Sequence, residues 1–348
     1  MGRFAFITHP DRAEDIKHFM PPAKYIPLRL AEGLGRVLPP LRVSELKVES
    51  PYGAAEGFII SINITSRQVD VLPQRAVIKR LTRAGRIAER LGADIIGLGG
   101  SNLIRNLAPE ALKITFAGES SYNIATALES LEEAFSLMGN SIQNAHAVVL
   151  GAAGHVGAVC SFILSGRVKS MTLVDSDKKR INELAGKIIF HSGLSSGISD
   201  DPTKAVRSAR MVIAAGAAGI SPADLAPGSV LCDLNRPPRL GRETGQSRDD
   251  VLVLEGGVIK MPGMAGNYSE PGFQSGMTGP FLAETIIVAL EKSLQKSCPV
   301  SCAGTEEVDR IRRLAQKHGF SRAGLMGPGG LINPENVEKV RKRSLAVV

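Results

Sequence analysis

The chain contains no tryptophan, and aromatic residues make up only 4% of its 348 residues. So few aromatic side chains argue against a stacking platform for single-stranded nucleic acid. Long hydrophobic runs are missing as well, because no stretch reaches the roughly 18 apolar residues that a membrane-spanning helix needs. We therefore expect no nucleic-acid partner and no membrane span.

Cysteine is also scarce. The four cysteines lack the spacing of a disulfide framework, which indicates a reducing compartment and a cytoplasmic protein. The apolar segments around Cys160 and Cys232 predict core positions for both. Cys298 and Cys302 lie on an expected loop with too few other ligands nearby for zinc, so we expect no metal site.

The net charge of +8 would favour acidic partners. The basic residues are scattered rather than gathered into a stripe, so the expected partner is a small-molecule or acyl substrate. Hydrophobic residues make up 43% of the chain and glycines number 37, which suits a soluble α/β protein. The length is sufficient for two domains with cores of their own.

The segment His146–Asp175 contains the strongest motif. It reads as a buried strand, a glycine turn, a helix and a second strand that ends in a carboxylate. Gly151 permits the sharp turn, Gly154 lets backbone N–H groups approach a pyrophosphate, and Gly157 permits close packing of the helix on the sheet. This context predicts a nucleotide-binding unit, with an ordinary α/β turn as the alternative.

The acid at the end of the second strand bears on the choice of nucleotide. A carboxylate at Asp175 favours the free ribose hydroxyls of NAD over the 2′-phosphate of NADP. The basic run Lys178–Arg180 follows at once, and either holds a phosphate or forms a solvated helical turn. NAD is the expected cofactor and NADP the alternative.

Further strands are expected at Met211–Ala215, Ser229–Asp233 and Val251–Glu255. In an open α/β sheet, ligands lie at the carboxyl ends of the strands, so the turns that follow are candidate cofactor contacts. The expected cofactor-binding residues are Gly151, Ala153, Gly154, His155, Val156, Gly157, Asp175, Ser176, Ala215, Gly216, Asn235 and Gly257.

The order of these elements predicts an α/β fold in which a Rossmann-type, doubly wound parallel sheet is inserted between an N-terminal α/β region and returning C-terminal helices. We expect a catalytic or substrate region at 1–118, a linking helix at 119–142 and an NAD(P)-binding domain at 143–262. Residues 263–348 would form a glycine-rich loop and helices that pack back on the N-terminal region, with a loose tail from Lys339. A homo-oligomer, such as a dimer, is also expected.

Candidate substrate contacts lie on two loops. Ser101 and Asn102 follow a short buried strand in a glycine turn, and Tyr122 and Asn123 open the linking helix. A structural turn and helix caps are the alternatives. His9, at the end of the first strand, is a candidate proton donor, with a capping or surface role as the alternative.

Several segments resemble the cyanobacterial long-chain fatty acyl-ACP reductases. The resemblance extends over most of the chain at low identity. The segments that carry it are Phe4–His9, Leu98–Ser101, Gly151–Cys160, Val253–Val258 and Lys317–Phe320. This resemblance implies reduction of an acyl thioester to an aldehyde, with a nucleophilic cysteine on the long C-terminal helix. Phe281 stands at that cysteine position, and Asp175 departs from the environment expected of an NADPH enzyme.

The leading hypothesis is therefore an NAD(P)-dependent, acyl-ACP-reductase-like oxidoreductase. It would transfer hydride to or from a carbonyl, alcohol or imine without a covalent cysteine intermediate. One alternative is an acyl-thioester reductase that forms an aldehyde, with Cys298 or Cys302 entering the site. The other is a non-catalytic NAD-sensing protein that acts through a partner.

Overall fold

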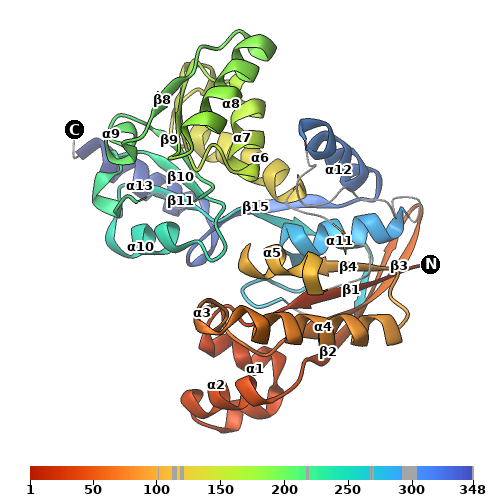
Figure 1. Cartoon of the computed structure of the whole chain (residues 1–348). Coiled ribbons are helices and arrows are strands. Elements are labelled where there is room, and N and C mark those ends of the chain that lie inside the picture. The colour runs from red at the N-terminus through yellow and green to blue at the C-terminus, as the bar shows by residue number, and fades with distance from the viewer. Residues whose placement is uncertain are drawn as a thin grey trace. The chain divides into compact units, whose positions relative to one another are not determined.

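The computed structural model describes residues 1–100, 102–111, 116–117, 121–216, 219–266, 268, 270–291 and 304–346. The chain folds into two compact units, each assembled from segments that are distant in sequence (Figure 1). Unit 1 comprises Met1–Tyr122, Ile259–Cys302 and Arg310–Ser321. Unit 2 comprises Asn123–Val258, Ala303–Asp309 and Arg322–Val348. Residues 123–142 of the expected linking helix thus belong to unit 2, and the C-terminal residues are divided between both units.

The sheet of unit 1 has the strand order β13-β2-β3-β1-β4-β5. Its parallel part consists of β3 (Gly53–Ser61), β1 (Gly2–Thr8), β4 (Ile95–Leu98) and β5 (Phe116–Ala117). Two further strands, β2 (Leu41–Ser50) and β13 (Met264–Gly266), extend this sheet in antiparallel pairing. The first strand, which ends before His9, and the short buried strand that precedes Ser101 are therefore present, as the sequence predicted.

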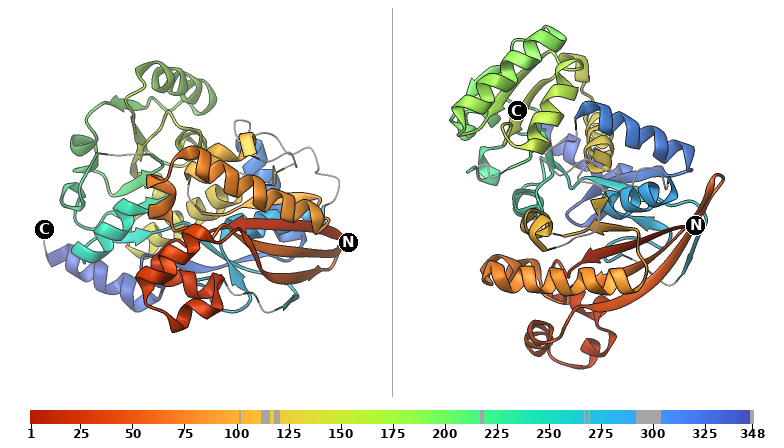
Figure 2. Two further views of the ribbon diagram at one scale, coloured as in Figure 1. Left: turned by 60° about the horizontal axis from the view of Figure 1, so that its bottom comes forward. Right: turned by 45° about the vertical axis from the view of Figure 1, so that its right-hand side comes forward.

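Helices α4 (Gln74–Arg90) and α11 (Pro280–Leu290) cover opposite faces of this sheet (Figure 2). Successive side chains of a β-strand point to opposite faces of the sheet, so one face of the sheet contacts α4 and the other contacts α11. Ile7 of β1 and Ile96 of β4 share a buried cluster with Leu81 of α4. On the other face, a Cβ at Gly97 would lie 1.9 Å from Thr285 Oγ1 of α11, so glycine allows that close approach.

The other helices of unit 1 are short. They are η1 (Ala13–Asp15), α1 (Ile16–Phe19), η2 (Pro21–Tyr25), α2 (Leu28–Val37), α3 (Ser66–Val71) and α5 (Asn102–Ala111). The segment 13–37 has its own small core around Ile16 and Ala31, which was not expected from the sequence. Helix α12 (Thr305–Lys317) begins in unit 2 and ends in unit 1, where Gly319 has a φ of 82°.

Unit 2 contains a parallel sheet with the strand order β11-β10-β9-β6-β7-β8. The strands are β6 (His146–Leu150), β7 (Ser170–Val174), β8 (Gly197–Ser199), β9 (Met211–Ala214), β10 (Val230–Asp233) and β11 (Leu252–Leu254). Counted within the unit, this is the order 3-2-1-4-5-6 of a Rossmann-type sheet. The expected fold class is confirmed.

Helices lie on both faces of that sheet, with α8 and α9 on opposite sides of β9 (Figure 1). They are α6 (Ser121–Leu137), α7 (His155–Ser165), α8 (Lys178–Ser192), α9 (Pro202–Val206) and α10 (Arg239–Ser247), with short turns η3 (Ile142–Asn144) and η4 (Pro222–Asp224). On the α9 and α10 side, Val206 packs with Val148 and Val212 in one buried cluster.

Four more strands form a sheet in the order β14-β12-β15-β16. They are β14 (Met277–Thr278), β12 (Gly257–Lys260), β15 (Ser321–Gly327) and β16 (Gly330–Ile332). β12 and β15 carry the chain from one unit into the other. The final helix, α13 (Pro334–Ala346), shows that the expectation of a loose tail from Lys339 was wrong, since Val337 is buried and Arg343 pairs with Asp249.

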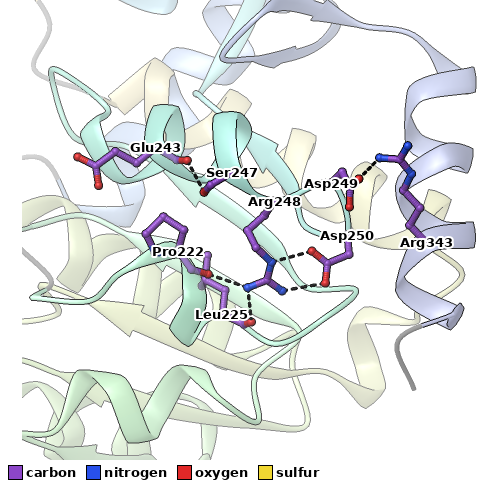
Figure 3. A network of polar contacts seen from close by, with 8 residues as sticks. All are labelled: Pro222, Leu225, Glu243, Ser247, Arg248, Asp249, Asp250 and Arg343. Atoms are coloured by element: carbon purple, nitrogen blue, oxygen red, sulfur yellow. Dashed lines mark hydrogen bonds and ion pairs between the residues drawn. The ribbon is translucent and has the colours of Figure 1, made fainter.

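Arg248, between α10 and β11, forms a polar network in unit 2 (Figure 3). Its guanidinium donates to both carboxylate oxygens of Asp250 at 2.7 and 2.8 Å. It also donates to the carbonyl oxygens of Pro222 and Leu225 at 2.7 and 3.1 Å. The hydrogen bonds from Arg248 hold the pKa of Asp250 below its ordinary value. Arg343 and Asp249 form a neighbouring pair that is much more exposed.

We expect Arg248→Ala to lower the free energy of unfolding by about 2–3 kcal/mol, because it removes charge-assisted hydrogen bonds and leaves Asp250 unpaired. The matched control Arg343→Ala should cost less than about 1 kcal/mol, since that pair is solvated. The difference in free energy of unfolding between the two variants should shrink as the pH falls through the depressed pKa of Asp250, where its carboxylate becomes protonated. Urea unfolding at several pH values measures both effects, and equal losses in the two variants would contradict this account.

Candidate functional site

The glycine turn after β6 depends on backbone contacts that exclude a Cβ. Gly151 has a φ of 77°, and a Cβ there would lie 2.7 Å from Gly216 Cα. The N–H groups of Gly151 and Ala152 donate to the Val174 carbonyl oxygen at 2.9 and 3.1 Å. The turn therefore fastens the ends of β6 and β7 and passes directly against the chain that leaves β9.

Helix α7 starts immediately after this turn. A Cβ at Gly157 would lie 2.2 Å from the Gly151 oxygen, so Gly157 allows the helix to meet the turn. At the N-cap, Gly154 is exposed, and a Cβ there would meet the same oxygen at 3.2 Å, a much milder contact. The first N–H groups of a helix have no partner within it, and they lie at the positive end of its dipole. This helix start is suited to an anion.

Asp175, at the end of β7, is held beside the turn. Its carboxylate accepts hydrogen bonds from the N–H groups of Ala153 and Asp177, each at 3.0 Å. Asp177 in turn accepts from the Arg180 N–H at 3.0 Å and caps α8. Ser176 is exposed. The acid that the sequence singled out therefore lies in contact with the glycine turn and is already oriented by backbone donors.

His155 is the first residue of α7 and is half-buried, as is Val156. Burial lowers the pKa of His155 from its ordinary value, so the imidazole is neutral at neutral pH. Its Nε2 atom is buried and has no hydrogen-bond partner among the described residues. A buried polar atom of this kind is normally satisfied, and a bound ligand could supply its partner.

Asn235, after β10, joins the strand ends. Its amide nitrogen donates to Asp233 Oδ1 at 2.9 Å and to the Gly216 oxygen at 3.3 Å. The Ala215 N–H donates to the Leu150 oxygen at 2.9 Å. The structure therefore brings Ala215, Gly216 and Asn235 to the same sheet edge as the glycine turn.

Asp233 was not foreseen as a site residue. It is fully buried at the end of β10, where burial raises its pKa although several donors oppose that effect. The Gly241 N–H donates to its Oδ2 atom at 2.9 Å, and the Asn235 N–H donates to its Oδ1 atom at 3.0 Å. A carboxylate inside an apolar strand was the available signal for this residue.

A second group of polar residues surrounds Gly256, which has a φ of 87°. A Cβ there would lie 2.9 Å from Asn123 Oδ1 and 3.0 Å from Arg236 Nη2. Asn123 is only 2% exposed, and its Oδ1 atom has no hydrogen-bond partner in the described part of the chain. Arg236 donates to the carbonyl oxygens of Asn235 and Glu255, each at 3.3 Å. Arg236 and Gly256 both lie in strand-end turns that the sequence indicated as candidate cofactor contacts, although neither was among the cofactor-binding residues named individually.

Gly257 is needed for packing inside the protein, so no ligand is required to explain why this position is a glycine. A Cβ there would lie 2.4 Å from Thr126 Oγ1 on α6. Gly256 and Gly257 are both buried, but they meet different neighbours. Of these two glycines, Gly256 is therefore the one that lies beside the polar group of Asn123 and Arg236.

In unit 1, the carboxyl ends of β1 and β4 bring His9 against Gly100. A Cβ at Gly100 would lie 2.1 Å from His9 Nε2, and His9 Nδ1 is 2.9 Å from the Pro10 oxygen. His9 is 4% exposed and burial lowers its pKa, so the surface alternative is wrong. Tyr122 is also buried, and its N–H donates to Glu284 Oε2 at 3.1 Å.

Ser101 lies outside the described residues, and Asn102 begins α5. The candidate substrate contacts at these two positions therefore stay predictions.

The cysteines bear on the type of chemistry. Cys160 and Cys232 are fully buried, which confirms the expected core positions. Burial raises the pKa of the Cys160 thiol strongly and that of Cys232 to about 12, so neither is a reactive thiolate. Cys298 and Cys302 lie outside the described residues. Phe281 lies in the first turn of α11.

Within the described residues, no group of three or more His, Cys, Asp or Glu side chains could hold a metal ion. A search of the same residues found no helix with the length and apolar character needed to span a bilayer.

No protein-family model matches the chain. It is 24% identical over 310 residues to the aminotransferase PigE of Serratia sp. (strain ATCC 39006), and the match covers 85% of this chain. The match spans only 36% of PigE, about a third of its length.

Solved structures with a related arrangement include dehydrogenases. Quinate dehydrogenase from Corynebacterium glutamicum, in complex with NAD, is 13% identical and has a TM-score of 0.35; the match covers 90% of this chain and 98% of that one. L-tryptophan dehydrogenase from Nostoc punctiforme is 11% identical and has a TM-score of 0.39; the match covers 99% and 89%. The fold class follows from the strand order of the sheet in unit 2. None of these three proteins is an acyl-ACP reductase by name.

We expect Gly157→Ala to destabilise the protein by about 1–3 kcal/mol, because its Cβ must displace the Gly151 backbone. Gly186→Ala is the matched control: Gly186 lies in the interior of α8 and has nothing within 4 Å of a Cβ. That control should be stabilised by up to about 1 kcal/mol, since alanine favours a helix over glycine. Thermal unfolding of the two variants tests the contact, and a stable Gly157→Ala would refute it.

Proposed function

We propose that this chain is an NAD(P)-dependent oxidoreductase that transfers hydride to or from a carbonyl, alcohol or imine. One observation carries the proposal. An uncapped helix start at the carboxyl edge of a 3-2-1-4-5-6 parallel sheet lies beside Asp175, which is fixed at the end of the next strand. This combination is typical of a dinucleotide site, where the pyrophosphate meets the helix and the acid binds the ribose.

The residues present fit such a cofactor. The open N-terminus of α7 would hold the phosphates, and the unpartnered Nε2 of His155 would gain a hydrogen-bond partner. Asp175 favours NAD over NADP, because a fixed carboxylate repels a 2′-phosphate. Asn123 on α6 and Arg236 after β10 would orient the nicotinamide around Gly256, which follows β11. The bound cofactor supplies or accepts the hydride, and the protein orients the reacting groups.

The described cysteines favour direct transfer over a covalent route. Cys160 and Cys232 are buried with raised pKa values. Phe281, on α11, stands where the resemblance to the acyl-ACP reductases would place a nucleophilic cysteine. The partial likeness to an aminotransferase supports a carbonyl substrate, since aminotransferases interconvert carbonyl compounds and amines. Reduction of an acyl thioester to an aldehyde, as in acyl-ACP reductases, is the second proposal, and it needs Cys298 or Cys302 as the nucleophile. A non-catalytic NAD sensor would bind the cofactor without turnover.

We expect Gly154→Ala to fold normally and to lose NADH binding. Its Cβ makes only a mild contact at 3.2 Å within the protein, but it occupies the exposed helix start where phosphates would approach. A loss of at least about tenfold in affinity, or 1.4 kcal/mol, is expected by calorimetry. Gly186→Ala, on another helix, should bind as the unmodified protein does. Normal NADH affinity in Gly154→Ala, or no binding by the unmodified protein, would argue against the proposal.

The buried Oδ1 atom of Asn123, which has no hydrogen-bond partner among the described residues, predicts a specific contact with the carboxamide N–H of nicotinamide. The unmodified protein should prefer NAD over its 3-acetylpyridine analogue, which lacks that N–H, by about 1–3 kcal/mol. Asn123→Leu should bind both equally, whereas Asn182→Leu on α8 should keep the preference. Calorimetric titration of both dinucleotides measures the difference. A preference that survives in Asn123→Leu would show that Asn123 does not make this contact.

A further inference from the structure

A serine, a histidine and a glutamate form a hydrogen-bonded chain in unit 1, outside the residues discussed above. Ser50 ends β2, His318 follows α12, and Glu291 follows α11. The distance from Ser50 Oγ to His318 Nδ1 is 2.8 Å, and the distance from His318 Nε2 to Glu291 Oε1 is 2.7 Å. Three elements that are far apart in sequence therefore place a hydroxyl, an imidazole and a carboxylate in line.

The partners determine where the protons lie. A carboxylate only accepts hydrogen bonds, so His318 carries a hydrogen on Nε2. In the neutral ring this fixes the tautomer in which the lone pair of Nδ1 faces Ser50. Burial raises the pKa of Glu291, but hydrogen bonds from Lys317 and His318 outweigh this effect and lower it overall. Glu291 is thus ionised at neutral pH and accepts from His318 Nε2, while Nδ1 of the same ring faces the Ser50 hydroxyl.

The imidazole is fixed while the serine stays within reach of solvent. His318 is 1% exposed, and Tyr52 meets its ring edge-on with centroids 6.1 Å apart. Ser50 is half-buried at the start of an exposed turn, where its oxygen also accepts the Tyr52 N–H at 3.2 Å. A nucleophile hydrogen-bonded to a base, with that base oriented by a third group, is the arrangement of covalent acyl-transfer sites.

We propose that Ser50 is a nucleophile that accepts an acyl group from an activated ester or thioester. The Ser50 oxygen attacks the acyl carbonyl carbon and forms an ester, while His318 Nδ1 takes the hydroxyl proton and passes it to the departing alkoxide or thiolate. Water then cleaves the ester, releasing a carboxylic acid and restoring the hydroxyl. Glu291 is a positioning residue that holds His318 in the required tautomer. This activity goes beyond the proposed hydride transfer and does not depend on it.

The test treats the full-length protein with a fluorophosphonate probe and maps the adduct by mass spectrometry. We expect a single modification at Ser50 and hydrolysis of p-nitrophenyl acetate, both absent in Ser50→Ala. Ser44→Ala is the control, because Ser44 is equally half-buried on β2 but donates only to a backbone oxygen. His318→Gln should slow labelling by about 10²- to 10⁴-fold, the usual contribution of a general base.

Two further variants keep the test decisive if Ser50→Ala unfolds. Ser50→Cys should react with iodoacetamide faster than free cysteine does, because His318 activates the thiol as well. In Glu291→Gln, the rise of the labelling rate with pH should move to lower pH, which a purely structural contact would not cause. Labelling with acyl-CoA separates Ser50 from the cysteines by the site of the adduct. No probe on Ser50, or equal labelling in His318→Gln, would overturn the proposal and leave a structural link between β2 and α12.

Discussion

The contact between the backbones of Gly151 and Gly216 is the constraint on which the rest of unit 2 depends. It brings the chain leaving β6 against the chain leaving β9, closer than any side chain would allow. Gly157 then lets α7 start over the same turn, so the positive end of the helix lies at the sheet edge. The site is therefore built chiefly from backbone, and side chains such as Asp175 and Asn235 hold that backbone in place.

The polar side chains at this edge divide into two kinds. Asp175, Asn235 and Asp233 have their hydrogen bonds within the protein and act as supports. Asn123 and His155 have buried acceptor atoms with no partner among the described residues. Burying an unsatisfied polar atom costs roughly 1–3 kcal/mol, so such atoms are uncommon without a function. His155 lies at the helix start and Asn123 beside Gly256, the places proposed for the phosphates and the nicotinamide of the cofactor.

Much of unit 2 could be predicted from sequence because its signals are local. The strands are short apolar runs, and Gly151, Gly154 and Gly157 have a spacing with a direct backbone meaning. Arg236 and Gly256 lie in turns that the sequence indicated, but their meeting with Asn123 could not be foreseen because Asn123 is distant in sequence. The link from Ser50 to His318 is non-local in the same way. The segment from Lys339 was expected to be loose because it is rich in charged residues. It is instead part of α13, in which Val337 is buried.

A crystal structure of the protein grown with NADH is the most direct test of the account. The account predicts density for the two phosphates at the start of α7, within hydrogen-bond distance of the N–H groups of His155 or Val156. The adenosine ribose should contact Asp175, and the nicotinamide should lie beside Asn123 and Gly256. Density for NADH elsewhere, or an empty helix start at saturating NADH, would contradict the central claim.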